Sequence, residues 1–168
     1  MPNLTMPDGK VLGHSTNAML RLLATKFGYY PEDPIAAYNS DFLCDLYADF
    51  NTPDNTGKGI LDPAGVEGRK KKVMASWEKF FGFMEEFVAP SGKKFLCGNT
   101  LTPADFMIGA WYTDYFANDN CPFYRAEFAA LLRKFPNFKA YGERFKAENQ
   151  AWIDKRPPGP LWDFKNDF

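Results

Sequence analysis

Ser15 is the first residue of this sequence whose type and position could support chemistry, because it directly precedes a run of residues with helical spacing. Gly28 follows the end of that run and is typical of the residue after a helix. The apolar positions between them recur at helical intervals: Ala18, Met19, Leu22, Leu23 and Phe27. An N-cap hydroxyl and the free amides of the first turn point at one spot, which suits a carboxylate or a phosphate. The alternative is an ordinary N-cap without a ligand.

Two charged runs are further candidates for binding. Asp41, Asp45 and Asp49 are spaced four residues apart, so in a helix they form an acidic stripe. Their repulsion of a few tenths of a kcal/mol per pair suggests a cationic partner, and a solvated helix face is the alternative. The basic run 69–72 lies in a predicted long helix, where it is either a solvated face or a binding patch.

The familiar catalytic and metal-binding templates are missing from the sequence. His14 is the only histidine, so a cluster of histidine ligands is excluded and a Ser/His/Asp triad would depend on that one residue. The glycines do not have the spacing of a phosphate-binding loop. A calcium loop starting at Asp49 fails because Pro53 and Asp54 occupy the positions of a ligand and the turn glycine. We therefore expect no metal site and no catalytic residue in this chain.

Composition indicates a globular protein without a bulk electrostatic attraction to polyanions. The chain has 168 residues, 20 basic against 21 acidic side chains and a net charge of -1, which argues against nucleic acid or an anionic membrane as partner. Aromatic residues make up 17% and predict a bulky core. No apolar run is long enough to span a membrane, and no signal peptide is evident, so we expect a cytoplasmic protein. The three cysteines, Cys44, Cys97 and Cys121, have no C-x-x-C spacing and are expected as reduced, buried thiols.

The elements that would position these residues are a hairpin followed by helices. Asp8-Gly9 between the short stretches 4–6 and 10–13 predicts a β-hairpin. The proline-rich stretch 29–34 predicts a linker, and the periodicity then predicts helices from 35 to 50, 63 to 87, 103 to 115, 124 to 134 and 136 to 148. Thr102 and Asp105 have the spacing of a capping box before the third of these helices, with Pro103 at its first position. That helix is apolar nearly all round and should be central.

The order of these parts resembles a cytosolic glutathione transferase across nearly the whole chain. The stretches 2–4, 8–12 and 14–15 are similar to the end of that family's thioredoxin-like domain, and 28–31 to its linker. The stretch 98–105 is similar to the capping-box motif of the central helix, and 135–138 and 155–157 to the last helices. The resemblance implies a mostly α fold, with a partial thioredoxin-like ββα unit at 1–28, a linker at 29–34 and an all-α C-terminal domain at 35–168.

The resemblance also implies a role for individual residues in holding glutathione. Pro2 would be the cis-proline before the third strand of the thioredoxin-like sheet, and Asn3 would offer its backbone to the cysteinyl part of glutathione. His14 stands where the family often has Gln or Glu. Ser15 matches the serine that binds the γ-glutamyl carboxylate. Asp49 matches the acidic residue that, in several classes, reaches the γ-glutamyl amine of the neighbouring subunit. Thr102 and Asp105 would be folding signals rather than ligands.

The implied activity is conjugation of glutathione, as a co-substrate rather than a cofactor, to a hydrophobic electrophile in a homodimer. The family's catalytic Tyr, Ser or Cys lies near its first strand, which would precede Met1. That residue stabilises the thiolate of glutathione by hydrogen bonding. We therefore expect weak or no conjugation by these 168 residues alone. The alternative is a non-catalytic interaction module of glutathione-transferase type.

Overall fold

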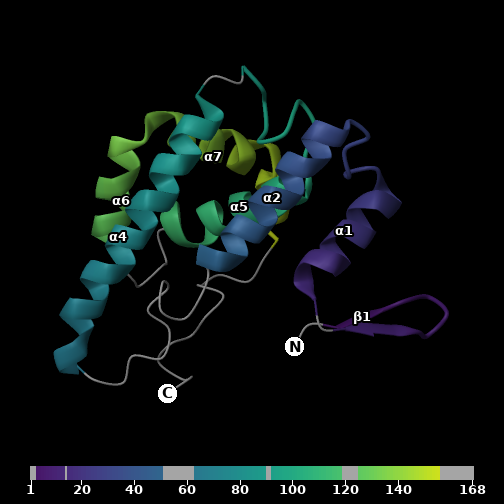
Figure 1. The fold of residues 1–168 in the computed structure, drawn as a ribbon, viewed down its shortest axis with the longest axis horizontal. Helices are drawn as coiled ribbons and strands as arrows, with labels where there is room; N and C mark the ends of the chain where they lie inside the picture. Colours follow the sequence, from purple (N-terminus) through teal and green to yellow (C-terminus); the bar gives the residue numbers. More distant parts are fainter. Residues whose placement is uncertain (1–2, 14, 51–62, 90–91, 119–124, 156–168) are drawn as a thin grey trace.

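The computed structural model describes residues 3–13, 15–50, 63–89, 92–118 and 125–155. A β-hairpin and one helix stand beside a bundle of helices, and α1 lies between the hairpin and α2 (Figure 1). The expected mostly α fold with a small sheet is confirmed. The expectations for Pro2, His14, Cys121 and the tail from 156 fall outside the described residues. Among the described residues, no helix combines the length and the apolar character that crossing a membrane requires.

The hairpin consists of two short antiparallel strands. Strand β1 (Asn3–Thr5) pairs with β2 (Val11–Gly13) in the register Asn3↔Gly13, Leu4↔Leu12 and Thr5↔Val11. Gly9 has φ of 84°, a left-handed conformation that favours glycine, and Lys10 N donates to Asp8 Oδ1 at 3.0 Å. The Asp-Gly signal thus produces the turn that the sequence predicts.

Local capping residues begin the first two helices. Helix α1 (Thr16–Phe27) begins after Ser15 and ends before Gly28, whose φ of 77° permits the left-handed C-terminal turn. Helix α2 (Pro34–Phe50) begins with a proline, and Asp33 Oδ2 accepts from the amide of Ala36 at 2.7 Å. In both helices the capping residue directly precedes the first helical residue in the sequence.

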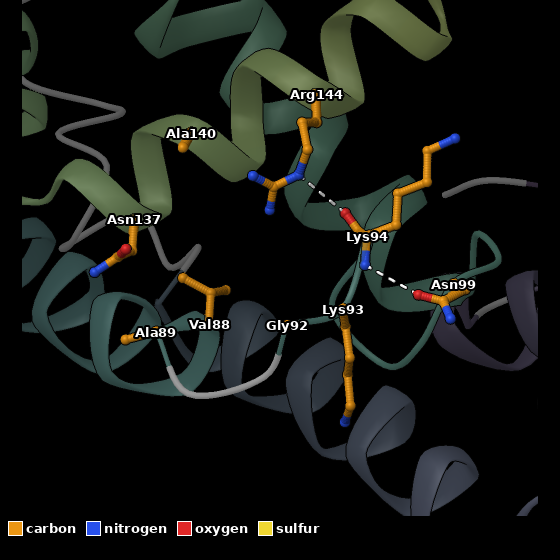
Figure 2. A pocket seen from close by; sticks show the side chains of 9 residues that line it. All are labelled: Val88, Ala89, Gly92, Lys93, Lys94, Asn99, Asn137, Ala140 and Arg144. Carbon is orange, nitrogen blue, oxygen red and sulfur yellow. Dashed lines mark hydrogen bonds between the residues drawn. The ribbon is translucent and has the colours of Figure 1, made fainter.

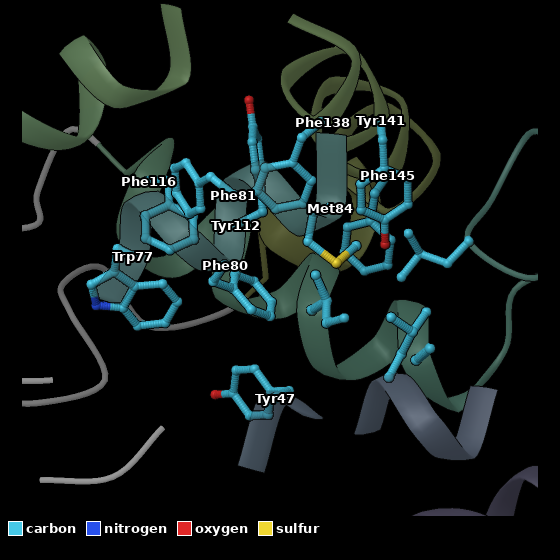
Figure 3. Packing of buried hydrophobic residues seen from close by; sticks show 14 of the residues in the cluster. Tyr47, Trp77, Phe80, Phe81, Met84, Tyr112, Phe116, Phe138, Tyr141 and Phe145 are labelled. Atoms are coloured by element: carbon cyan, nitrogen blue, oxygen red, sulfur yellow. The ribbon is translucent and has the colours of Figure 1, made fainter. Parts of the chain in front are cut away.

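The remaining helices follow, and all of them except α8 bury side chains in the aromatic core. They are α4 (Pro63–Val88), α5 (Pro103–Trp111), α6 (Arg125–Lys134), α7 (Pro136–Glu148) and α8 (Gln150–Ile153). Helix α5 packs against α2 on one side and α7 on another, which agrees with its apolar sequence. Rings from α4 and α7 meet beside α5, as Trp77, Phe81 and Phe138 do in Figure 3. Burying one such ring contributes about 1.5–3 kcal/mol.

The helix predicted over 103–115 changes its hydrogen-bond pattern near its end. Tyr112–Phe116 form the π-helix η1, and Ala117 N donates to Tyr112 O at 2.9 Å across five residues. At this level Gly142 of α7 lies directly against the Tyr112 ring, where a Cβ atom would collide with it. Apolar periodicity carries no information on this wider turn, because α- and π-helical pairings can bury the same aromatic residues.

Candidate functional site

Ser15 makes the N-terminus of α1 a defined polar site. Its backbone is extended (φ -142°, ψ 111°), and its Oγ accepts from the amide of Ala18 at 3.3 Å. The residue is exposed, and the first turn of the 12-residue helix holds no acidic side chain. The helix N-terminus carries a partial positive charge there. This end can therefore receive a carboxylate from solvent.

The hairpin brings Asn3 to the same end of the unit. In the strand register Asn3 lies opposite Gly13, which is two residues before Ser15. A Cβ atom on Gly13 would lie 2.8 Å from Asn3 Oδ1, so the missing side chain leaves room for the asparagine. Asn3 is exposed. Two residues assigned to one site from sequence thus lie at the same end of the hairpin.

Side chains of α1 and the linker bind two of the three aspartates on α2. Arg21 Nε contacts Asp41 Oδ1 at 2.8 Å, and Tyr30 Oη donates to Asp41 Oδ2 at 2.9 Å. Asn17 Nδ2 donates to Asp45 Oδ1 at 2.8 Å. The hydrogen bond to Asp41 raises the pKa of Arg21, and burial followed by the same carboxylate raises that of Tyr30. The acidic stripe therefore has a cationic partner within its own chain.

Asp49 lies at the level where α1 begins. The contacts Arg21–Asp41 and Asn17–Asp45 show that α1 and α2 run antiparallel, because four residues back along α1 correspond to four residues forward along α2. Asp49 comes one turn, about 6 Å, after Asp45 on the same stripe. The exposed Asp49 thus lies toward the end of the helix pair that carries Ser15.

These α1–α2 contacts were not predicted from sequence. The signal was available, because Asn17 and Arg21 are four residues apart on α1 and Asp41 and Asp45 are four apart on α2. Two such pairs match when the helices are antiparallel. The sequence alone does not show that α1 faces α2, so the matching pairs could be recognised only in the structure.

A partly exposed aromatic surface lies on the bundle next to α2. Tyr47 and Trp111 have ring centroids 5.3 Å apart, and Trp111 stacks on Tyr115 at 4.4 Å. Tyr47 is buried, whereas the other two keep part of their surface exposed. Trp77 also stacks on Trp111, with ring centroids 4.9 Å apart, so a hydrophobic molecule would meet the edge of Trp111 and the ring of Tyr115.

Thr102 and Asp105 lie inside the bundle and face no open site. Asp105 Oδ2 accepts from Thr102 N at 2.9 Å and from Thr102 Oγ1 at 2.8 Å. Its Oδ1 accepts from Leu96 N at 3.0 Å and from Tyr141 Oη at 3.1 Å. Burial raises the pKa of Asp105, and these hydrogen bonds oppose part of that rise. The carboxylate joins the loop before α5, the start of α5, and α7.

The described cysteines do not provide a reactive thiol. Cys44 and Cys97 are buried and free, and burial raises their pKa to about 12 and about 11. Such thiols are almost entirely protonated at neutral pH and therefore poor nucleophiles. Among the residues that the structure describes, no group of three or more His, Cys, Asp or Glu side chains could hold a metal ion.

Comparison with known proteins connects this arrangement to one family. A family model described as "Glutathione S-transferase, C-terminal domain" matches residues 61–156. A probable glutathione S-transferase 5 of Caenorhabditis elegans is 32% identical over 160 residues, which cover 92% of this chain and 72% of that protein.

Solved structures agree with this likeness. A monomeric glutathione S-transferase of the hookworm Necator americanus is similar with a TM-score of 0.75 and 27% identity, over 94% of this chain and 74% of that one. A glutathione transferase from Streptococcus pneumoniae, solved in complex with glutathione, has a TM-score of 0.66 over 82% of this chain and 53% of that one. At 18% identity this second likeness concerns the fold alone.

Proposed function

The chain belongs to the glutathione S-transferase family, and on this premise we propose that it binds glutathione at the Ser15 end of α1. The observation that carries the proposal is the exposed N-terminus of α1, where a serine hydroxyl and the first-turn amides converge and the first turn itself has no acidic side chain. The γ-glutamyl carboxylate is the part of glutathione that this positive helix end would hold.

Asn3 and Asp49 extend the proposed site in two directions. The backbone of Asn3, at the open end of the hairpin, would pair with the cysteinyl part of glutathione. In a homodimer, Asp49 of one subunit would attract the γ-glutamyl amine of the glutathione that is bound to the other subunit. Pro2 and His14 remain proposed members of the site as the cis-proline and the replacement for Gln or Glu. In this proposal residues 1–28 are the thioredoxin-like part, 29–34 the linker, and 35–168 the all-α domain.

We propose that the complete enzyme is a cytoplasmic detoxifying transferase that conjugates glutathione to a hydrophobic electrophile. The partly exposed rings of Trp111 and Tyr115 would contact the electrophile. In this reaction a glutathione thiolate attacks the electrophilic carbon, a carbon–sulfur bond forms, and the leaving group departs with its electron pair. A group that hydrogen-bonds the thiolate lowers the thiol pKa and raises the rate. We propose that this group precedes the segment similar to residues 2–15, so that the 168 residues alone conjugate weakly.

Glutathione affinity with a graded series at Ser15 tests the site. Ser15→Ala removes the hydroxyl but also costs about 1 kcal/mol of helix capping. Ser15→Asp keeps a good N-cap and places a negative charge where the carboxylate of glutathione would lie. Ser15→Thr keeps a hydroxyl cap. We expect the wild type and Ser15→Thr to be retained on immobilised glutathione and Ser15→Asp to pass through while remaining folded by circular dichroism.

The other outcomes decide against the proposal. Retention of Ser15→Asp equal to that of the wild type would place glutathione elsewhere on the chain. Passage of the wild type itself would favour a non-catalytic interaction module. The intact mass of the native protein, compared with 19.1 kDa, checks whether a further segment supplies the thiolate-stabilising group.

A further inference from the structure

The first turn of α1 is attached to the bundle through Asn17, the second residue of the helix. Asn17 Nδ2 donates to Asp45 Oδ1 of α2 at 2.8 Å. Four residues further along α1, Arg21 Nε contacts Asp41 Oδ1 at 2.8 Å. Helix α1 is thus held at two levels, and the Asn17–Asp45 pair lies at the level closer to Ser15.

The backbone of Asn17 is also one of the hydrogen-bond donors at this helix end. The first amides of a helix have no acceptor within the helix. Ser15 Oγ accepts from the amide of Ala18, so the amides of Thr16 and Asn17 are the other donors of this turn. The residue whose side chain binds α2 therefore also holds one of the amides that a carboxylate would meet.

The attachment of this turn affects binding because helix ends open locally. A terminal turn with few contacts opens at low free energy, and the two-stranded hairpin before it is at best marginally stable by itself. An open turn disperses the Ser15 hydroxyl and the amides that converge at this end. A ligand of the site binds only the closed fraction, so its apparent affinity falls as that fraction falls. A contact that keeps the turn closed therefore raises affinity without touching the ligand.

We propose that Asp45 is a positioning residue for the glutathione site, which it keeps closed through Asn17. The proposal rests on the function proposed above, since it needs glutathione at the Ser15 end. The sign of the effect separates this role from electrostatics. The charge of Asp45 lies beside the turn that would receive a carboxylate, so by repulsion alone it would weaken binding. Positioning has the opposite sign, because the same side chain then strengthens binding.

The glutathione affinity of variants of the full chain, measured by calorimetric titration, tests this role. Asp45→Ala removes the acceptor together with the charge, and we expect affinity to fall at least about threefold, up to the roughly tenfold that one hydrogen bond represents. Asp45→Asn removes the charge but keeps an oxygen that accepts from Asn17, so its affinity should equal or exceed that of the wild type. Asn17→Ala should weaken binding as Asp45→Ala does, and the double variant should lose no more than either.

Hydrogen exchange of backbone amides in the ligand-free protein adds a readout that a loss of overall folding would not reproduce. Ala18 N donates to Ser15 Oγ at 3.3 Å and Met19 N to Ser15 O at 3.1 Å, so both amides exchange when the first turn opens. In Asp45→Ala their exchange should accelerate, while the amide of the fully buried Phe81 on α4 keeps its rate. Equal acceleration at all three amides would mean general destabilisation and would overturn the positioning role.

Two controls assign the effect to α1. Glu86→Ala makes the same charge change as Asp45→Ala on the exposed surface of α4 and should leave affinity within about twofold. An alternative place for the anionic glutathione is the hollow of about 450 Å³ between α4, the loop 92–99 and α7 (Figure 2). Arg144 lines this hollow, and its Nε donates to the backbone oxygen of Lys94 at 3.2 Å. Arg144→Gln should also leave affinity within about twofold, because the proposed site lies on α1.

The outcomes separate this proposal from the proposed function. No glutathione binding by the wild type, or a large loss in Arg144→Gln, would overturn the Ser15 site and the positioning role together. Binding by the wild type with an unchanged or higher affinity in Asp45→Ala would overturn the positioning role alone. A loss in Asp45→Asn as large as in Asp45→Ala would do the same, because the hydrogen bond would then carry none of the effect. Additive losses in the double variant would mean that Asn17 and Asp45 act separately, which also contradicts the proposal.

Discussion

Replacing Asp105 by alanine is expected to cost the bundle about 3–5 kcal/mol of unfolding free energy. The carboxylate is fully buried and accepts four hydrogen bonds, two from Thr102 and one each from Leu96 and Tyr141. Alanine leaves these donors without an acceptor, at about 1–3 kcal/mol for each that cannot relax. Some of them will find other partners, so the sum of four such terms is an overestimate.

The assay is urea unfolding followed by far-ultraviolet circular dichroism, with thermal unfolding beside it. For a chain of this size a loss of 3–5 kcal/mol lowers Tm by about 6–20 °C. Thr102→Ala is the matched control, because it removes the hydroxyl donor together with the cap and should cost only about 1 kcal/mol. A loss below about 1 kcal/mol in Asp105→Ala would refute the reasoning that these four hydrogen bonds are made at one buried carboxylate.

The pH dependence of the same variant series has a definite sign. Burial raises the pKa of Asp105 in the folded state, so the folded protein binds this proton more tightly than the unfolded chain does. The corresponding stability is fully present below the unfolded pKa and is lost as pH rises through the folded pKa. The advantage of the wild type over the non-titrating Asp105→Asn should therefore grow as pH falls through that range. An advantage that shrinks on acidification would mean that the hydrogen bonds lower the pKa of Asp105 more than burial raises it.

Two further predictions concern helix packing and a surface ion pair. Gly142→Ala should destabilise by about 1–3 kcal/mol in urea, because its Cβ would collide with the Tyr112 ring. Gly82→Ala, whose Cβ has only an ordinary contact at 3.7 Å, should instead stabilise by up to about 1 kcal/mol. Lys70 contacts Glu127 at 2.5 Å and lowers its pKa, so Glu127→Gln should cost at most about 1 kcal/mol near neutral pH. This cost should disappear as pH falls below the lowered pKa of Glu127, and a cost that persists there in urea unfolding would assign it to packing.

Local signals in the sequence predict the ends of elements well. Ser15, Gly28 and the Asp8-Gly9 turn each act through the backbone of their own segment, so no distant residue is needed to interpret them. The central position of α5 also follows from its own apolar surface. The π-helix η1 does not, and its first residue, Tyr112, packs against Gly142 of a different helix. The sequence pattern therefore does not predict the packing between segments that are distant along the chain.

The candidate site divides in the same way. The proposal that it binds an anion follows from an N-cap and a helix end, which are local features of residues 15–18. The identity of the anion does not follow from them, since any carboxylate or phosphate suits such a helix end. Glutathione is proposed as this anion because of the family resemblance. The register of the hairpin adds that Asn3 and Ser15 lie at one end.

The acidic stripe of α2 holds the helix that carries the proposed glutathione site. A two-stranded hairpin is at best marginally stable by itself, so the described sheet is too small to fix the position of α1. Asp41 binds Arg21 and Tyr30, and Asp45 binds Asn17, close to the N-terminus of α1. These contacts explain why like charges are tolerated four residues apart. They also give the three aspartates different roles. Asp41 and Asp45 hold α1 in position, whereas Asp49 lies toward the end of α1 that carries Ser15.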